Sequence, residues 1–249
     1  MPRQFAMSLS LALSLLALTA CTTPQTAPQA GGASTAPQQS SGSTAPTGTS
    51  GTGSNAFTAD FSTMSAFSKD WTITDTAASP SDGPSAWTIN TPGTLSQTSN
   101  IFRSDNEYDN FEGSDAVING GKDWKNYAFK VTINPTDDDG VGVLFRYQDE
   151  NNYYRLLNVQ DSGNQGPFTR LQVKQNGTYK TLGDNAQALI PSGQATAVEV
   201  DANGAHLMVK IGGTTAFDVQ DTTFASGTCG LSVYAESGVD FTNLSVNPL

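Results

Sequence analysis

The sequence has few of the residues that most metal and redox sites need. Among its 249 residues there are one histidine, His206, and two cysteines, Cys21 and Cys229. This supply excludes zinc fingers, iron–sulfur clusters and copper sites built from several histidines. His206 is therefore interpreted as a structural residue.

Charge is absent from one long segment, and positive charge is scarce in the rest. Residues 22–56 contain no Asp, Glu, Lys or Arg, and they lack aromatic residues, Leu, Ile and Val. Such a segment cannot bury enough apolar surface to offset its chain entropy, so we predict a disordered tether at 21–56. The predicted folded domain, 57–249, holds all 23 acidic residues and every basic residue except Arg3, a net charge of −12. A field of that sign argues against a nucleic-acid partner.

The N-terminus is typical of a secretory signal, predicted to cover residues 1–20. Arg3 precedes an apolar run from Phe5 to Ala20, which has the length of a signal-peptide core and is short for a membrane span. The run ends in Leu18-Thr19-Ala20-Cys21, which resembles the lipobox of bacterial lipoproteins. The resemblance implies lipidation of Cys21, and Thr22 after it suggests the outer membrane or the cell surface. The alternative is an ordinary signal peptide with an unrelated cysteine; in the first case Cys229 has no partner and is expected to be a buried thiol.

From residue 57 onward the sequence shows the two-residue alternation of β-strands without a sustained helical stripe. Turn signals such as Asn176-Gly177 and Gly212-Gly213 separate the runs. About a dozen short strands predict an all-β fold, an antiparallel two-sheet sandwich. The predicted strands are Trp71–Asp75, Ala86–Asn90, Tyr127–Asn134, Val141–Gln148, Asn152–Val159, Phe168–Gln175, Ala195–Asp201, His206–Ile211, Thr214–Val219, Thr228–Tyr234 and Phe241–Val246.

Three stretches of this domain resemble the laminin-G-like and concanavalin-like jelly rolls. They are Trp124–Tyr127, Asp137–Asp149 and Asn152–Leu156, and the likeness extends over nearly all of 57–249. The resemblance implies a jelly-roll β-sandwich. It leaves the function open, because such folds serve in binding, adhesion and hydrolysis.

Alternation also places basic residues of the central strands on one predicted sheet face. The central hairpin is expected to set Tyr147 opposite Tyr154, facing the core, and Arg146 opposite Arg155, on the other face. Two opposed arginines repel unless an anion lies between them, so we interpret this face as a groove for a carboxylated, sulfated or phosphorylated ligand, with Tyr153 as a stacking platform. The alternative is an internal network with acidic residues, or a solvated polar face. The candidate ligand-binding residues are Lys130, Arg146, Tyr153, Arg155, Arg170 and Lys174.

Enzymatic alternatives rest on weaker patterns. Glu107, Asp109 and Glu112 have the spacing of the catalytic strand of family 16 glycoside hydrolases, in which two carboxylates act as nucleophile and acid/base. The asparagines and the glycine around them favour a solvated loop, where carboxylates are poorly held, so no catalytic residue is predicted. A copper superoxide dismutase is less favoured still, because it needs several imidazoles.

The run Asp137-Asp138-Asp139 is the candidate metal site, and Ca²⁺ is the ion that carboxylate and carbonyl oxygens suit. The alternative is a hairpin turn that uses Asp and Gly for their local geometry. Related jelly rolls often hold calcium against a carboxylate near the last strand. Thr242 occupies that position here, which leaves Asp60 and Asp240 as further candidates.

Together these features predict a lipid-anchored lipoprotein of the cell envelope. Its jelly-roll module is expected to recognise a glycan or an envelope protein without catalysis. The alternative is a structural subunit of a surface-layer or outer-membrane assembly, which could be oligomeric.

Overall fold

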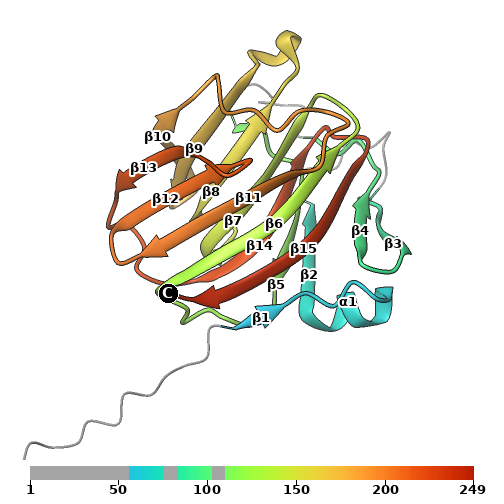
Figure 1. The fold of residues 1–249 in the computed structure, drawn as a ribbon, viewed down its shortest axis with the longest axis horizontal. Helices are drawn as coiled ribbons and strands as arrows, with labels where there is room; N and C mark the ends of the chain where they lie inside the picture. Colours follow the sequence, from blue (N-terminus) through green and yellow to red (C-terminus); the bar gives the residue numbers. More distant parts are fainter. Residues whose placement is uncertain (1–55, 76–83, 103–109) are drawn as a thin grey trace, which may run out of the picture. The chain divides into compact units, whose positions relative to one another are not determined.

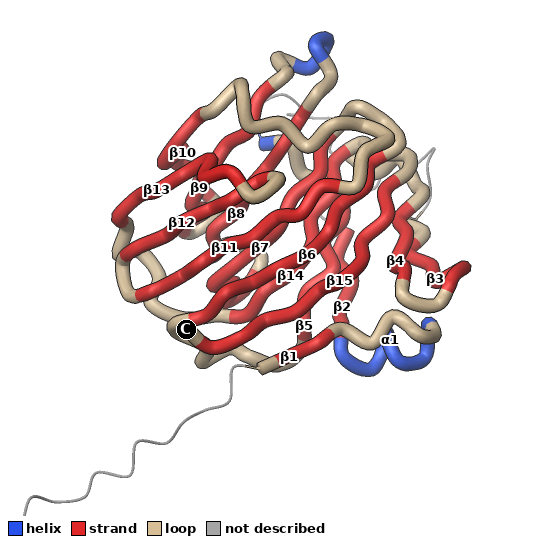
Figure 2. The backbone as a smooth tube through the Cα atoms, in the orientation of Figure 1, coloured by secondary structure: helices blue, strands red, loops and turns tan. Residues whose placement is uncertain are grey.

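Strands dominate the structure, a computed structural model that describes residues 56–75, 84–102 and 110–249. In these ranges fifteen strands form two antiparallel sheets, which pack face to face (Figures 1 and 2). The predicted all-β sandwich is confirmed, and each predicted strand is present with its ends displaced by at most two residues. Four strands were not predicted, because they are short or carry Asp and Gly among their residues.

The first sheet contains eight of the described strands and is called the eight-stranded sheet. The short strand β1 pairs with β15 of this sheet and lies outside the linear order of the other seven strands. Its strands, in spatial order, are β13 (Thr214–Gln220), β12 (His206–Ile211), β11 (Thr196–Asn203), β6 (Tyr127–Pro135), β15 (Val239–Pro248), β4 (Thr94–Gln97) and β3 (Trp87–Thr91), with β1 (Phe57–Thr58) beside β15.

The second sheet contains seven of the described strands and is called the seven-stranded sheet. Its order runs from β10 at one edge to β2 at the other. The strands are β10 (Thr178–Asp184), β9 (Phe168–Gln175), β8 (Asn152–Val159), β7 (Gly140–Asp149), β14 (Thr228–Tyr234), β5 (Ser114–Ile118) and β2 (Trp71–Asp75).

One short helix, α1 (Met64–Asp70), leads into β2 at the lower right of Figure 1. Thr63 begins it by accepting the Ala66 amide at 3.2 Å, as an N-cap residue does. Phe67 buries the inner side of α1 by stacking on Trp71, with ring centroids 5.6 Å apart. A single turn of 3₁₀ helix, η1 (Ser162–Asn164), follows β8. None of the helices in the described ranges has the length and apolarity that crossing a membrane requires.

The core lies between the two sheets and is built by alternate residues of each strand. From β6, Phe129 and Ile133 face inward, and from β7 and β8, Phe145 and Tyr154 do so, their rings stacked at 5.2 Å. The three tryptophans are at most 8% exposed and pack in this core, and Cys229 is buried as a free thiol, as predicted.

A β-bulge in β7 breaks this alternation. Residues Leu144 and Phe145 still pair with Arg155 and Tyr154 of β8, but the register then shifts. Arg146 has φ +47°, a left-handed conformation that a non-glycine residue adopts only where its surroundings hold it. The predicted pairing of Arg146 with Arg155 is therefore wrong, because the bulge turns Arg146 inward.

Candidate functional site

The candidate site lies on the side of the seven-stranded sheet that faces away from the core, which we call the outer face. The registers of β5, β14, β7, β8, β9 and β10 place alternate residues there. The residues that matter below are Asp115, Val117, Leu144, Tyr147, Tyr153, Arg155, Gln172, Lys174 and Tyr179.

Three tyrosines form a row across the outer face. Tyr147 stacks on Tyr153 with ring centroids 5.5 Å apart, and the bulge explains why it faces outward rather than into the core as predicted. The hydroxyl oxygens of Tyr153 and Tyr179 lie 2.6 Å apart. The Lys174 ammonium lies over both of these rings, 5.4 and 5.1 Å from their centroids. Burial raises the pKa of all three tyrosines, that of Tyr147 to about 12, so the row is neutral at physiological pH.

Beside this row lies a buried charged network. Lys174 Nζ contacts Glu112 Oε1 at 2.7 Å, and both side chains are at most 7% exposed. The Arg155 guanidinium donates to the carbonyls of Asn110 and Phe111 and to Gln172 Oε1, at 2.7, 3.0 and 2.8 Å. Residues 110–112 therefore lie across this part of the outer face and pair with both cations, although Arg155 Nε has no hydrogen-bond partner among the described residues.

Asp115 of β5 is the acid of the outer face whose protonation is most perturbed. It is 7% exposed and pairs in register with Ser232 of β14 and Thr74 of β2. Burial raises the pKa of Asp115 to about 6, and the opposing effects of the Ser232 hydroxyl, Arg155 and Lys174 are smaller. The carboxylate is thus ionised at neutral pH yet close enough to its pKa to accept a proton.

An open hollow of about 220 Å³ lies at the β2 side of the outer face. Thr72 and Thr74 present hydroxyls to it, and Thr72 Oγ1 donates to Asn119 Oδ1 at 2.6 Å. The half-buried ring of Tyr147 forms one wall. Hydroxyl, amide and ammonium groups around an aromatic ring suit a small polar ligand that has an apolar face. The lining residues are Thr72, Thr74, Val117, Ile118, Asn119, Lys122, Tyr147 and Thr228.

Two of the predicted ligand-binding residues do not belong to this face. Lys130 lies on β6 of the eight-stranded sheet, where it pairs with Glu199 at 3.0 Å, so its predicted place beside the arginines is wrong. Arg146 is fully buried, and its guanidinium donates to the carbonyls of Phe224, Lys125 and Gly204. It connects three loops from inside the sandwich and offers no surface to a ligand.

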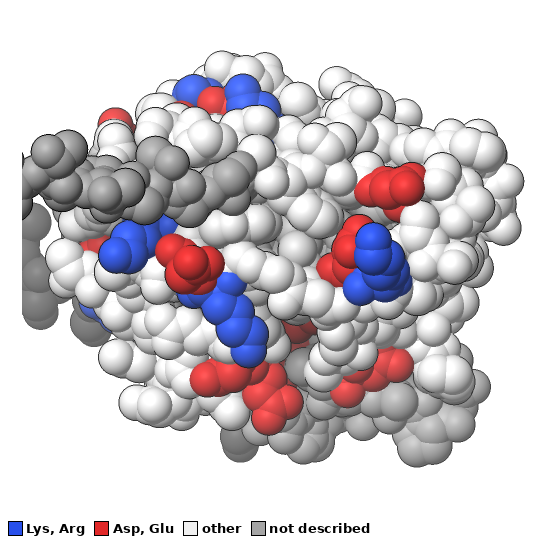
Figure 3. Space-filling model, turned by 90° about the horizontal axis from the view of Figure 1, so that it is seen from below, with Lys and Arg blue, Asp and Glu red and all other residues white. Residues whose placement is uncertain are grey.

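The other four residues share the outer face, but as internal contacts. Tyr153, Arg155 and Lys174 are at most 6% exposed. Arg170 donates to Asp184 at 2.8 Å and lies 3.8 Å from the Phe168 ring centroid. The expected anion-binding groove is thus replaced by pairing with the protein's own acids and carbonyls. On the face shown in Figure 3, basic and acidic side chains likewise lie next to each other.

Of the three acidic residues that resemble a glycoside hydrolase motif, only one lies in the described ranges. Glu107 and Asp109 lie outside the described residues. Glu112 lies in the described ranges, and its carboxylate pairs with Lys174.

His206 of β12 pairs with the Asp218 carboxylate at 2.6 Å on the eight-stranded sheet. Within the described ranges, the one group of three or more His, Cys, Asp or Glu side chains close enough to share a metal ion is Asp137, Asp138 and Asp139.

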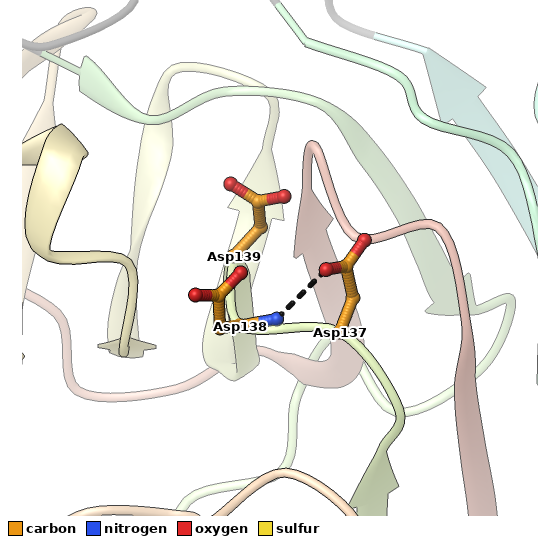
Figure 4. Close-up of side chains that lie close together, drawn as sticks. All are labelled: Asp137, Asp138 and Asp139. Atoms are coloured by element: carbon orange, nitrogen blue, oxygen red, sulfur yellow. Dashed lines mark hydrogen bonds between the residues drawn. The ribbon is translucent and has the colours of Figure 1, made fainter.

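The three aspartates lie in the turn between β6 and β7 (Figure 4). One carboxylate oxygen from each can lie within 4.8 Å of the other two. Asp137 Oδ1 accepts the Asp138 amide at 3.0 Å, so the Asp137 carboxylate also stabilises the turn. Of the further candidates, Asp60 accepts the Ser62 amide and Asp240 accepts the Ser96 hydroxyl.

Sequence reasoning missed the hollow, Asp115 and the outward direction of Tyr147. Strand β5 was not predicted, and its Asp115 therefore had no assigned face. The sequence did offer one signal for the hollow, because Thr72 and Thr74 alternate along β2. Polar residues at alternate positions of a strand indicate the sheet face that is exposed to solvent.

The fold defines the class of the protein as a jelly-roll β-sandwich of the concanavalin-like and galectin-like kind. The chain belongs to the family of 3-keto-alpha-glucoside-1,2-lyase-like domains, whose sequence profile matches residues 68–247. A comparison with curated proteins found no match.

Solved structures of similar fold include proteins from several bacteria. Carbohydrate binding module CBM66 from Bacillus subtilis has 16% identity and a TM-score of 0.54, over 72% of this chain and 95% of that one. A galectin-like protein of unknown function from Bacillus subtilis has 10% identity and a TM-score of 0.57, over 77% and 94%. A putative glycosyl hydrolase from Parabacteroides distasonis has 14% identity and a TM-score of 0.50, over 73% and 94%. Identities this low show the shared fold.

Proposed function

We propose that this chain binds a carbohydrate in the hollow beside Tyr147 on the outer face. The observation that carries the proposal is the juxtaposition of that ring with the Thr72 and Thr74 hydroxyls and the Asn119 amide. Sugars combine an apolar ring face, which packs on an aromatic ring, with hydroxyls that need hydrogen-bonding partners.

The comparisons support a sugar over other polar ligands. The family description refers to a keto derivative of an alpha-glucoside, and one solved structure of similar fold is described as a carbohydrate binding module. A glucoside oxidised at carbon 3 is therefore the ligand class to test first. An anionic ligand is not needed to neutralise Arg155 and Lys174, because both already have partners within the protein.

A second candidate is lyase activity on such a keto sugar, and Asp115 is the observation that favours it. A ketone at carbon 3 acidifies the hydrogen on carbon 2. A base that removes this proton allows a double bond to form between carbons 1 and 2 as the bond from carbon 1 to the leaving oxygen breaks, and that oxygen takes up a proton. A carboxylate with a pKa of about 6, paired across the sheet with Thr74 of the hollow, is suited to accept the proton at neutral pH.

The envelope location is proposed from the N-terminal sequence. Cleavage before Cys21 and acylation of its thiol would tether the domain through residues 22–56, whose span as a flexible chain is about 30–35 Å. Metabolic labelling with a palmitate analogue tests this. Label in the wild type and none in Cys21→Ser supports lipidation, and equal labelling of both contradicts it.

Binding is tested with the full chain against a panel of neutral disaccharides, their 3-keto derivatives and soluble polysaccharides, by calorimetry. Tyr147→Ala and Thr74→Ala are expected to weaken binding at least about tenfold, because each removes one element of the hollow. Thr215→Ala is the matched control, since Thr215 is an exposed strand threonine that lines a different hollow on the eight-stranded sheet. Binding that survives Tyr147→Ala, or falls equally in Thr215→Ala, contradicts the proposed location.

Lyase activity is tested separately, by following a 3-keto disaccharide with NMR. Turnover that falls at least about 100-fold in Asp115→Asn while binding persists supports the second candidate. Binding without turnover in the wild type leaves recognition alone as the function.

A further inference from the structure

A hollow of about 580 Å³ lies at the edge of β15, where this strand exchanges one neighbour for another. Residues 239–241 of β15 pair with β4, whereas Ser245 and Val246 pair with β1. Since β6 pairs with β15 in both stretches, β4 and β1 lie along the other edge (Figure 1). The hollow is lined by residues 58–62, 92–93 and 243–245, and we call it the edge hollow.

The segments that line the edge hollow are fixed to one another by backbone hydrogen bonds. The Ala59 amide donates to the Leu244 carbonyl at 3.0 Å, and the Gly93 amide donates to the Phe61 carbonyl at 2.8 Å. Phe61 and Leu244 are at most 4% exposed and belong to the core between the sheets. The edge hollow is therefore preformed, which spares a ligand the cost of ordering it.

Asn243 lies at a β-bulge of β15 and has an unusual backbone conformation. The register of β15 on β6 shifts between Thr242 and Ser245, and Asn243 has φ +53°, which glycine adopts more readily. Its amide nitrogen reaches the hydroxyls of Thr132 and Thr242 only at 3.4 Å, which is long for a hydrogen bond. The exposed carboxamide thus keeps most of its capacity to donate and accept for a ligand in the edge hollow.

Asp60 carries the one charge among the described residues that line the edge hollow. Hydrogen bonds from the Ser62 hydroxyl and amide hold the pKa of Asp60 below its ordinary value, so the carboxylate is ionised at neutral pH. Lys69 attracts the carboxylate but contributes least to the lowered pKa. Lys130, on the adjoining stretch of β6, is paired with Glu199 at 3.0 Å. The edge hollow therefore offers a negative charge to a cationic ligand and repels anions.

The size of the edge hollow favours a small organic cation over a metal ion. Its volume lies in the range of small-molecule sites and is far larger than a single ion fills. Asp60 is its one carboxylate among the described residues, whereas Ca²⁺ sites usually combine several. An ammonium group, with three donors and no acceptor, suits a single carboxylate.

We propose that the edge hollow binds an amino sugar, whose ammonium donates to Asp60 and whose hydroxyls bind Asn243. The hydroxyls suit a carboxamide, because both groups donate and accept. Pro92 and Leu244 line the same hollow and suit the C–H groups of a sugar ring. The edge hollow belongs to the eight-stranded sheet, so the site is separate from the hollow beside Tyr147 and does not depend on the proposed function.

The test is calorimetry at about pH 6 with the trisaccharide of glucosamine and its N-acetylated form, which keeps the ring hydroxyls but lacks the charge. The parent protein is the full chain with Tyr147→Ala, so that the hollow beside Tyr147 does not contribute. We expect the glucosamine trisaccharide to bind at least about threefold more tightly, with the difference falling as salt is added. Asp60→Asn keeps an oxygen for the Ser62 amide, so it is expected to fold and to bind both probes equally.

Two variants serve as matched controls. Asp149→Asn should keep the preference for the charged probe, because Asp149 is also an exposed acid that accepts the amide two residues ahead, but in a turn of the other sheet. Asn243→Gly is expected to fold, because glycine adopts a φ of +53° freely, and to bind both probes at least about threefold more weakly. Asn176→Gly, at φ +51° between β9 and β10, should bind as the parent does.

The proposal is overturned if the parent binds neither probe at about 20 mM, binds the two equally, or keeps its preference in Asp60→Asn. Undiminished binding in Asn243→Gly would place the sugar elsewhere on the chain and overturn the site. Binding of trilysine at least as tight as that of the glucosamine trisaccharide would assign the edge hollow to a basic peptide and overturn the choice of ligand.

Discussion

Replacement of Asp115 by Asn should stabilise the protein at neutral pH and leave its stability unchanged in acid. The folded chain holds the Asp115 proton up to about pH 6, whereas its ordinary pKa is 3.8. Between these two values the folded state binds more protons than the unfolded state, so this group lowers the stability as the pH rises. A pKa difference of about 2 corresponds to about 3 kcal/mol, reached above pH 6 and absent below about pH 4.

The amide of Asn is uncharged at every pH and keeps an oxygen for the Ser232 hydroxyl. We therefore expect Asp115→Asn to be more stable than the wild type by about 3 kcal/mol at pH 8, with the difference vanishing near pH 4. Urea unfolding at a series of pH values measures this, with the fluorescence of the buried tryptophans as the signal. Asp123→Asn, on an exposed loop, is the control and should change stability by less than about 0.5 kcal/mol at each pH.

A stability change of the opposite sign at pH 8 would contradict the expected cost of burying the Asp115 charge. A variant less stable than the wild type would mean that Arg155 and Lys174 hold Asp115 as a net stabilised anion. If the variant is more stable but binds or converts the sugar less well, Asp115 is retained for function at a cost in stability.

Two further predictions concern the outer face and the sheet beneath it. Lys174→Met leaves the Glu112 carboxylate buried without its cation and should lower the free energy of unfolding by about 3–5 kcal/mol, measured in urea; a loss below about 1 kcal/mol would show that the pair is solvated. Gly142→Ala places a methyl group against the Leu156 carbonyl and should cost at least about 2 kcal/mol, whereas Gly120→Ala meets open space and should change stability by less than about 1 kcal/mol; equal losses would contradict the packing of β7 on β8.

Alternation was sufficient to predict the sandwich, because most strands keep one face in the core. Tyr154 was assigned inward from its position alone, and it stacks there on Phe145. The prediction failed for Arg146 and Tyr147, since a bulge depends on tertiary contacts. The Arg146 amide donates to the Tyr127 hydroxyl, and Gly227 passes so close to Arg146 that a larger residue would not fit.

The site was harder to predict than the fold, because the side chains that pair with one another in it are distant in the sequence. Lys174 and Glu112 are 62 positions apart, and nothing in either local sequence indicates that they pair. The aspartates themselves were identifiable because they are consecutive.

The most direct test of sugar binding beside Tyr147 is a crystal structure of the chain with its tightest-binding sugar. We expect a sugar ring packed on Tyr147, with hydroxyls bonded to Thr72 or Thr74, on the outer face of the seven-stranded sheet. A sugar bound on the eight-stranded sheet, near Lys130, would contradict it.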